Sequence, residues 1–244
     1  MESKDCLLVI LAGGLGTRLK PLTDKVPKSM LEVEGKPFLE HQIELVKKHG
    51  LQNILLLTGH QGETIEKHFQ DGSRFGVSIK YSRESSPAGT AGALKLAEPL
   101  LPAGFLLMYG DAYLDFQYGR LWERFRHCAR KAVMAIFRND NRWGRSNVAY
   151  DLPLVVRYCP ASEADENRGG QNPLVYIDYG VSAISKDVLS AIPEGKPWSM
   201  EQVFAGLAAA RQLDGFELFQ RFYEIGSSEG LEDFRGFIRE RGSS

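Results

Sequence analysis

Three glycines and an arginine follow the first apolar segment of the chain. The segment is 7–12, and Gly13, Gly14, Gly16 and Arg18 come after it. Glycines let backbone N–H groups approach a polyanion, because no Cβ atom stands in the way. The guanidinium group of arginine binds phosphate oxygens through a fixed fork of donors. The stretch therefore predicts a loop that binds phosphate groups.

The loop does not match two familiar glycine-rich motifs. A dinucleotide-binding fingerprint requires G-x-G-x-x-G, and Leu19 stands where the third glycine belongs. A Walker loop requires Gly-Lys followed by Ser or Thr, and the loop does not contain this sequence. An oxidoreductase of the Rossmann type is therefore a weak alternative.

Apolar segments that end in glycine alternate with helical patterns along the first part of the chain. Nearly continuous apolar runs are typical of strands that are buried on both faces of a parallel sheet. The expected strands are 7–12, 53–58, 77–81, 105–109 and 133–137, and the expected helices are 37–50, 63–69 and 90–96. This alternation predicts an α/β fold with a Rossmann-like, doubly wound and mostly parallel sheet.

In such sheets, ligands bind at the carboxyl ends of the strands. The glycines at these ends are Gly13, Gly59 and Gly110, so chemistry is expected beside them. Asp111 follows Gly110 directly. A carboxylate there can cap the next element, but its place at a strand end favours a metal ligand.

The second half of the chain has a different character. Segments 174–184 and 219–225 are expected as strands, 197–212 and 231–239 as helices, and the polar segment 163–172 as a loop. We find no convincing linker and expect one domain over 1–244. Its first half covers about 1–138 and its second half about 139–244.

Composition excludes several classes of protein. The 244 residues are 43% hydrophobic and 25% charged, with 30 Lys and Arg against 31 Asp and Glu. This near-neutral balance argues against non-specific nucleic-acid binding, and no apolar run is long enough for a membrane helix. The cysteines, Cys6, Cys128 and Cys159, are widely spaced, which indicates a reducing compartment without structural zinc. We therefore expect a cytoplasmic protein.

Longer motifs resemble those of the sugar-1-phosphate nucleotidylyltransferases, also called NDP-sugar pyrophosphorylases. The opening motif of that family, G-G-x-G-T-R-L-x-P-L-T, matches 13–23, and its Pro-Lys pair near Met-Leu matches 27–31. The resemblance continues through 89–94, 109–111, 176–180 and 224–227. It therefore spans nearly the whole chain.

The resemblance implies a fold of the nucleotide-diphospho-sugar transferase type with a small sugar-binding extension. It implies that the half over about 1–138 is the nucleotide-binding half and that the half over about 139–244 is the acceptor-binding half. It also implies nucleotidyl transfer from an NTP to a sugar 1-phosphate, by in-line attack on the α-phosphate with release of pyrophosphate. Two polyanions that must meet repel each other. Arginine, lysine and Mg²⁺ held by carboxylates are therefore the expected cations.

Roles carry over residue by residue. Arg18 is implied to steady the triphosphate, and Lys28 to contact phosphates near the reacting centre. Asp111 is implied to hold Mg²⁺ together with Glu224, which stands where many relatives have aspartate. The residues implied to bind the nucleotide are Leu11, Ala12, Gly13, Gly14, Gly16, Thr17, Arg18, Gln61, Gly89, Thr90 and Gly110. The residues implied to bind the acceptor are Asn147, Tyr179 and Gly180.

One departure from the family leaves the acceptor open. Many relatives carry a lysine that holds the sugar phosphate just before the loop that corresponds to 163–172. The corresponding run here, 157–160, reads Arg-Tyr-Cys-Pro and contains no lysine. Arg157 is one candidate to replace it.

The sequence also leaves the base and the oligomeric state open. The stretch around Asn147 and the segment 176–180 resemble the heptose 1-phosphate guanylyltransferase-like branch, and guanine is implied by this resemblance alone. The alternatives are a cytidylyl- or uridylyltransferase that acts on another phosphorylated acceptor, and a non-catalytic nucleotide-sugar-binding module. The joint presence of Arg18, Lys28, Asp111 and Glu224 favours an enzyme, expected as a monomer or homodimer.

Overall fold

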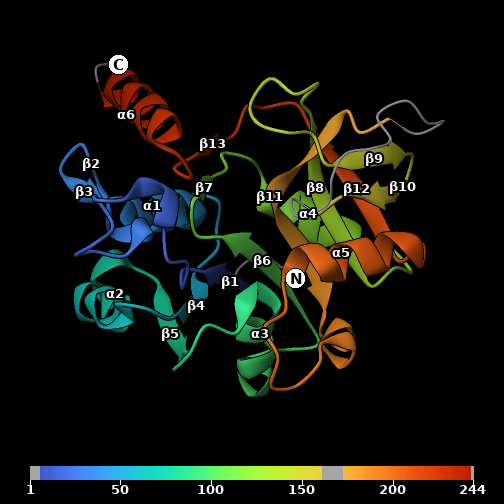
Figure 1. The fold of residues 1–244 in the computed structure, drawn as a ribbon, viewed down its shortest axis with the longest axis horizontal. Helices are drawn as coiled ribbons and strands as arrows, with labels where there is room; N and C mark the ends of the chain where they lie inside the picture. Colours follow the sequence, from blue (N-terminus) through green and yellow to red (C-terminus); the bar gives the residue numbers. More distant parts are fainter. Residues whose placement is uncertain (1–5, 161–172, 243–244) are drawn as a thin grey trace. The chain divides into compact units, whose positions relative to one another are not determined.

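The computed structural model describes residues 6–160 and 173–242, which form an α/β fold (Figure 1). The strands are β1 (Leu7–Leu11), β2 (Glu32–Val33), β3 (Lys36–Pro37), β4 (Asn53–Thr58), β5 (Ser78–Arg83), β6 (Gly104–Tyr109), β7 (Ala112–Tyr113), β8 (Ala132–Arg138), β9 (Val148–Asp151), β10 (Leu154–Tyr158), β11 (Tyr176–Ser185), β12 (Leu213–Leu218) and β13 (Tyr223–Glu224). The α-helices are α1 (Phe38–Lys48), α2 (Gly62–Phe69), α3 (Gly89–Leu96), α4 (Tyr118–Arg126), α5 (Met200–Ala209) and α6 (Ser228–Gly242). The short 3-10 helices are η2 (Thr17–Leu19), η3 (Lys28–Met30), η4 (Ser73–Phe75), η5 (Glu98–Leu100) and η6 (Lys186–Ala191). No helix in the described ranges is long and apolar enough to span a membrane.

The chain divides into two compact units, and neither is continuous in sequence. The first unit contains 1–87, 108–116 and 222–244, and the second contains 88–107 and 117–221. The C-terminal segment returns to the first unit, and the predicted halves over about 1–138 and 139–244 stay predictions. A single domain over 1–244 stays a prediction.

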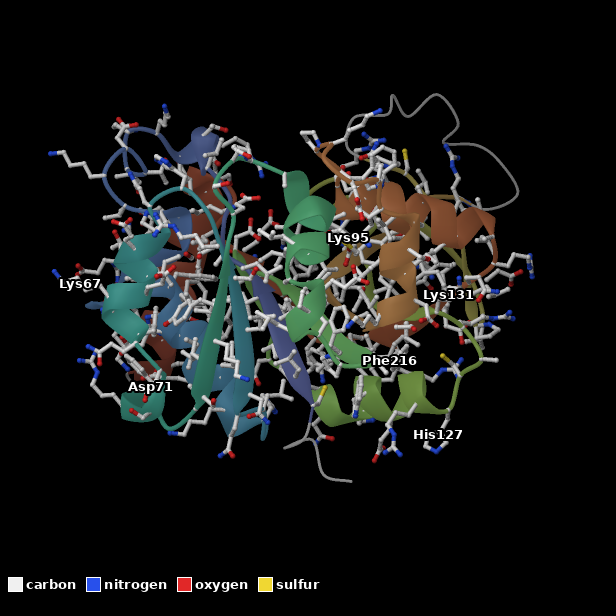
Figure 2. The ribbon with its side chains drawn as sticks, turned by 90° about the horizontal axis from the view of Figure 1, so that it is seen from below. Lys67, Asp71, Lys95, His127, Lys131 and Phe216 are labelled. Atoms are coloured by element: carbon white, nitrogen blue, oxygen red, sulfur yellow. The ribbon has the colours of Figure 1, made fainter. Side chains whose placement is uncertain are left out.

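The first unit contains the parallel strands that the apolar runs predict. Its strand order is β5-β4-β1, and both neighbouring pairs are parallel. The carboxyl ends of these strands therefore lie at one edge, where the phosphate loop, Gly59 and Glu84 follow them. Helix α2 packs with the buried Ile65 and Phe69 inward, while Lys67 points outward (Figure 2).

Helix α6 belongs to the first unit because it buries apolar side chains there. Phe234 is fully buried and meets Phe38 of α1 edge-on, with ring centroids 5.0 Å apart. Ile225, just before α6, joins the same cluster as Leu19, which follows the phosphate loop. The last segment of the chain and the loop after β1 are thus anchored in one core. Figure 1 shows α6 beside α1 and the β2–β3 hairpin.

The second unit contains a mixed sheet, and the prediction of a mostly parallel sheet is wrong there. The strand order is β6-β11-β8-β12-β10-β9. Strands β8 and β12 are parallel, but β8–β11, β10–β12 and β9–β10 are antiparallel. The short connection between β9 and β10 explains the last pairing, because a tight hairpin joins only antiparallel strands. The predicted loop 163–172 lies outside the described residues.

Strand β12 was not expected, and the strand predicted over 219–225 is reduced to β13. Asp214 and Gly215 interrupt the apolar pattern of β12. Asp214 is 4% exposed at its side chain and pairs with Arg124 at 2.7 Å, so its charge is compensated inside the unit. A Cβ at Gly215 would lie 2.5 Å from the Tyr150 ring. Phe219, which suggested a strand, is 81% exposed.

Candidate active site

The phosphate loop keeps its shape through local contacts. Gly16 has a φ of +61°, a left-handed conformation that favours glycine, and a Cβ there would lie 2.8 Å from Thr23 Cγ2. The Thr23 hydroxyl donates a hydrogen bond to the Gly16 carbonyl at 2.9 Å. The exposed Arg18 lies on η2, and the buried side chain of Leu19 anchors this short helix.

Asp111 lies in a tight turn between β6 and β7. Gly110 packs so closely against β1 that a Cβ would lie 2.5 Å from the Leu11 carbonyl oxygen. The Gly110 N–H donates to that oxygen at 3.1 Å. The close approach explains why glycine precedes the carboxylate.

Glu224 reaches the same place from the far end of the chain. Strand β13 pairs with β7 in antiparallel fashion, with Glu224 opposite Ala112. The Ile225 N–H donates to the Asp111 carbonyl oxygen at 2.9 Å. Asp111 and Glu224 are more than a hundred residues apart in sequence, and this short ladder places their carboxylates side by side.

Arg18, Lys28, Asp111 and Glu224 converge beside Gly226. A Cβ at Gly226 would lie 3.3 Å from Arg18 Nη2 and 3.8 Å from both Asp111 Oδ2 and Glu224 Oε1. The Lys28 ammonium group forms an ion pair with Asp111 Oδ2. The first unit therefore brings together two cations and two carboxylates, as the sequence predicts.

The electrostatics of Glu224 reflect this crowding. The residue is exposed as a whole, but partial loss of water around its carboxyl group raises its pKa above the ordinary value. The charge of Asp111 raises this pKa further, whereas Arg18 and Lys28 lower it. Two carboxylates that repel each other in this way provide a place where an added cation is favourable.

The carboxylate pair fits a magnesium ion that is shared with a substrate. In the described part of the chain, no group of three or more His, Cys, Asp or Glu side chains is arranged to hold a metal. Mg²⁺ in nucleotide enzymes typically takes one or two carboxylates and completes its shell with water and phosphate oxygens. Asp111 and Glu224 face one space, so they meet this requirement.

A cavity of about 610 Å³ opens at the carboxyl edge of β1, β4 and β5. Its lining residues are Gly13, Leu15, Gly59, His60, Gln61, Arg83, Glu84, Ser85, Ser86 and Pro87. Glu84 Oε1 would lie 3.4 Å from a Cβ at Gly13 and 2.8 Å from one at Gly59. The cavity thus presents a carboxylate between two glycine backbones.

The sequence reasoning located part of this cavity and missed the rest. Gly13 and Gln61 were predicted to bind a nucleotide and line it, whereas Glu84 was not considered. A usable signal was present, because Glu84 directly follows a strand whose carboxyl end shares an edge with β1 and β4.

The remaining nucleotide-binding candidates divide between the two units. Near the loop in the first unit lie Leu11, Ala12, Gly14, Gly16, Thr17 and Gly110. Gly89 and Thr90 belong to the second unit, where they support the start of α5. A Cβ at Gly89 would meet the Trp198 carbonyl oxygen at 2.5 Å, and the Thr90 hydroxyl accepts a hydrogen bond from Met200 N at 2.7 Å. Their nucleotide contacts stay predictions.

Two of the three acceptor candidates are linked through Asp178 in the second unit. Asn147 Oδ1 accepts a hydrogen bond from Asp178 N at 3.0 Å, and Asp178 Oδ1 accepts one from Gly180 N at 2.9 Å. The third candidate, Tyr179, is 1% exposed, and its hydroxyl donates to the Gln220 carbonyl at 3.1 Å, so its contact with the acceptor stays a prediction. The Tyr179 side chain is therefore part of the core of the second unit.

The Asp178 carboxyl group is shielded from water, although the residue as a whole is half-buried. This desolvation raises the pKa of Asp178 to about 7. The charge of Glu201 raises it as well, whereas hydrogen bonds from Gly180 and Tyr158 lower it. Between about pH 4 and 7, Asp178 is therefore protonated in the folded protein and ionised in the unfolded chain.

We expect Asp178→Asn to stabilise the protein at high pH only. Because the folded pKa is raised, wild-type stability falls as pH rises toward 7, and the neutral amide removes this penalty. The Tm difference between variant and wild type should grow from pH 4 to 7 and then level off, by about 2–4 °C per kcal/mol. Thermal denaturation across this range measures it. The exposed Asp151→Asn serves as the control, and equal behaviour of both variants contradicts the expectation.

The place of the missing lysine holds a sulfur atom and a neighbouring guanidinium group. Cys159 precedes Pro160 and is 1% exposed. Arg145 Nη2 donates to Cys159 Sγ at 3.1 Å. Arg145 therefore brings positive charge from a neighbouring segment to this position, a feature that the sequence reasoning missed. Arg157, the replacement that the sequence suggested, lies on β10 opposite Ala149.

Comparison with known proteins agrees with this geometry. Residues 7–144 match the family model described as nucleotidyl transferase. A D-glycero-alpha-D-manno-heptose 1-phosphate guanylyltransferase of Campylobacter jejuni is 38% identical over 195 residues, which cover 80% of this chain and 82% of the relative. The catalytic subunit beta of mannose-1-phosphate guanylyltransferase from Drosophila pseudoobscura is 30% identical over 225 residues. That alignment covers 89% of this chain, which thus spans only 58% of the relative.

A solved structure has the same fold over almost the full length. HddC from Yersinia pseudotuberculosis, crystallised in complex with GMP-PN, aligns with a TM-score of 0.76 and 25% identity. The alignment covers 96% of this chain and 99% of that one. Together with the match over 7–144, these similarities show that the chain belongs to the nucleotidyl transferase family.

Proposed function

We propose that the protein transfers a nucleotidyl group from an NTP to a sugar 1-phosphate and releases pyrophosphate. The observation that carries the proposal is the convergence of Arg18, Lys28, Asp111 and Glu224 beside Gly226. Two cations at this spot offset the repulsion between two phosphorylated reactants. The bond that forms joins an acceptor phosphate oxygen to the α-phosphorus, and the bond that breaks releases pyrophosphate.

The chain itself supplies position and charge rather than a covalent nucleophile. Backbone N–H groups of the loop 13–17 cradle phosphate oxygens, and the Arg18 fork holds the leaving pyrophosphate. Lys28 stays near the reacting centre because its ion pair with Asp111 orients it. Preorganised charge of this kind stabilises the transition state without reorganisation during the reaction.

Asp111 and Glu224 would hold the metal ion, which we propose is Mg²⁺. When bound, Mg²⁺ neutralises phosphate charge and aligns the phosphate oxygens for in-line attack. Loss of water and the neighbouring charge of Asp111 both raise the pKa of Glu224, and the negative charge of this pair supports a divalent cation at this position.

For the nucleotide, Glu84 favours guanine. Guanine presents two neighbouring donors, N1–H and the N2 amino group, and a carboxylate offers two acceptor oxygens. Uracil and thymine present one N–H between two carbonyl oxygens, and a carboxylate repels these oxygens. The guanylyltransferase names of the similar proteins point the same way.

We expect Glu84→Gln to shift base preference from GTP toward UTP. Loss of a charge-assisted pair of hydrogen bonds costs about 1.5–3 kcal/mol, so kcat/KM for GTP should fall roughly 10- to 100-fold. Glutamine offers one acceptor and one donor, which suit the N3–H and O4 of uracil. Pyrophosphate release with each of four NTPs measures the shift.

Glu63→Gln is the matched control for this variant. Glu63 is 77% exposed at its side chain and pairs with Arg83, which lines the same cavity, but it does not itself line it. We expect its base preference to equal that of the wild type. An unchanged GTP preference in Glu84→Gln would remove Glu84 from base recognition.

The acceptor class is tested separately. Wild-type protein with each NTP and Mg²⁺ is offered hexose and heptose 1-phosphates, amino-acid phosphates and phosphonates, and pyrophosphate release is recorded. Turnover with a sugar 1-phosphate supports the proposal. Turnover with another phosphorylated acceptor alone supports the alternative reaction, and nucleotide-sugar binding without turnover supports a non-catalytic module.

A cytoplasmic location and a monomer or homodimer complete the proposal. Cys6, Cys128 and Cys159 carry reduced thiols, which a reducing compartment preserves. Chromatography with light scattering measures the oligomeric state.

A further inference from the structure

Gln42 is a buried polar side chain that makes two contacts next to Asp111. It lies on α1 and is 1% exposed. Its Nε2 atom donates to the carbonyl oxygen of Tyr109 at 3.2 Å and to that of Ala112 at 2.6 Å. These two carbonyls flank the pair Gly110–Asp111, so both amide hydrogens hold the turn that carries the carboxylate.

The turn is braced from three elements. The Gly110 N–H donates to Leu11 O at the end of β1, and the Asp111 carbonyl accepts from Ile225 N after β13. Gln42 adds the brace from α1. The backbone contacts fix the residues at the middle of the turn, whereas the amide of Gln42 fixes the peptide groups on either side of them.

Core packing alone does not explain a glutamine at this position. Its Oε1 atom is buried and finds no hydrogen-bond partner among the described residues. A buried carbonyl oxygen without a partner is unfavourable, and an apolar side chain of similar volume would avoid it. Methionine has a similar length and volume but no N–H donor. The two donated hydrogen bonds are therefore what distinguishes glutamine from methionine at this position.

We propose that Gln42 is a positioning residue for the metal ligand Asp111. Its amide holds the 109–112 turn so that the Asp111 carboxylate faces the space beside Gly226, next to Arg18 and Glu224. The inference rests on the proposed function, since it takes Asp111 as a metal ligand. Gln42 itself touches neither substrate nor metal.

The test compares Gln42→Met with the wild-type protein. Mn²⁺ binding is followed by electron paramagnetic resonance in the presence of a non-hydrolysable GTP analogue, and the Mg²⁺ concentration for half-maximal pyrophosphate release is measured separately. Loss of a group that orients a metal ligand typically costs 10- to 100-fold in metal affinity. The dissociation constant of Mn²⁺ and the half-maximal Mg²⁺ concentration should therefore both rise about 10-fold or more. At saturating Mg²⁺, kcat should recover most of the wild-type rate.

His41→Phe is the matched control. His41 precedes Gln42 on α1, is also buried, and hydrogen-bonds the Val33 carbonyl at 2.9 Å, away from Asp111. We expect this variant to lower Tm without changing Mn²⁺ binding. If Gln42→Met also lowers Tm and leaves Mn²⁺ binding unchanged, Gln42 is only structural and the inference is wrong.

A second variant covers a failure of Gln42→Met to fold. Gln42→Asn keeps the amide on a side chain that is one methylene shorter, so it reaches one carbonyl at most, and an intermediate Mn²⁺ affinity is expected. Wild-type affinity in Gln42→Asn also overturns the inference. Wild-type protein that releases no pyrophosphate with any NTP would instead overturn the proposed function, so the two failures are distinguishable.

Discussion

Asp111→Asn is expected to lower kcat by about 10²- to 10⁴-fold while the fold is kept. The amide has nearly the same shape, but it removes a charged metal ligand and the ion-pair partner of Lys28. Metal-ion stabilisation of transition-state charge is worth several kcal/mol, and each 1.36 kcal/mol is tenfold in rate. Pyrophosphate release over a range of Mg²⁺ concentrations, together with Tm, measures the effect.

Asp115→Asn separates chemistry from stability. Asp115 lies four residues further on and bonds His49 at 2.8 Å and Arg241 at 2.6 Å, so it ties α6 to the first unit. Burial raises the pKa of Asp115, but the hydrogen bonds with His49 and Arg241 together outweigh burial and hold the pKa below its ordinary value. We expect Asp115→Asn to lower Tm with little change in kcat. Full activity of Asp111→Asn with Mg²⁺ would refute the metal assignment.

The difference between these two aspartates shows which parts of the site a sequence can predict. Asp111 follows a continuous apolar run and a glycine, a local pattern that marks the carboxyl end of a buried strand. The run becomes β6, and the runs at 7–12 and 53–58 become β1 and β4 for the same reason. Where one strand is buried on both faces, its own residues are enough to predict it.

Elements that depend on distant partners could not be predicted in this way. Strand β12 contains Asp214, whose buried charge is compensated by Arg124 of α4 and by Arg130. Strand β13 has two residues, and only its ladder with β7 defines it. Glu224 was placed by family resemblance, since neither periodicity nor spacing indicates which strand end it would meet.

Glu84 and Gln42 were missed for related reasons. Glu84 lines the cavity because three parallel strands end at one edge, which requires the strand order to be known. Gln42 lies on the mostly apolar inner face of α1, and only the contact with the 109–112 turn shows what its amide does. The place of Glu84 directly after a strand is a local signal only once the strand order is known, and the role of Gln42 leaves no local signal.

Arg18→Ala is expected to slow the reaction by at least about 10²-fold, mainly in kcat. Arg18 Nη2 lies 3.3 Å from the position of a Cβ at Gly226, and the Asp111 and Glu224 carboxylates each lie 3.8 Å from the same position. Removing one group that stabilises developing charge typically costs 10²–10³ in rate. Initial rates at saturating and limiting NTP separate the loss in kcat from any rise in KM.

Two further variants distinguish a fixed guanidinium fork from mere positive charge. Arg18→Lys keeps the charge but loses bidentate binding, so its kcat should lie between those of wild type and Arg18→Ala. Lys20→Ala removes a cation from the same loop, but Lys20 is 62% exposed at its side chain and pairs with Asp24, so its kinetics should match the wild type. Equal losses in Arg18→Ala and Lys20→Ala would mean that the loop acts only through its overall charge. Because Arg18 is the one of these two cations that lies beside Asp111 and Glu224, we expect the loss to be confined to it.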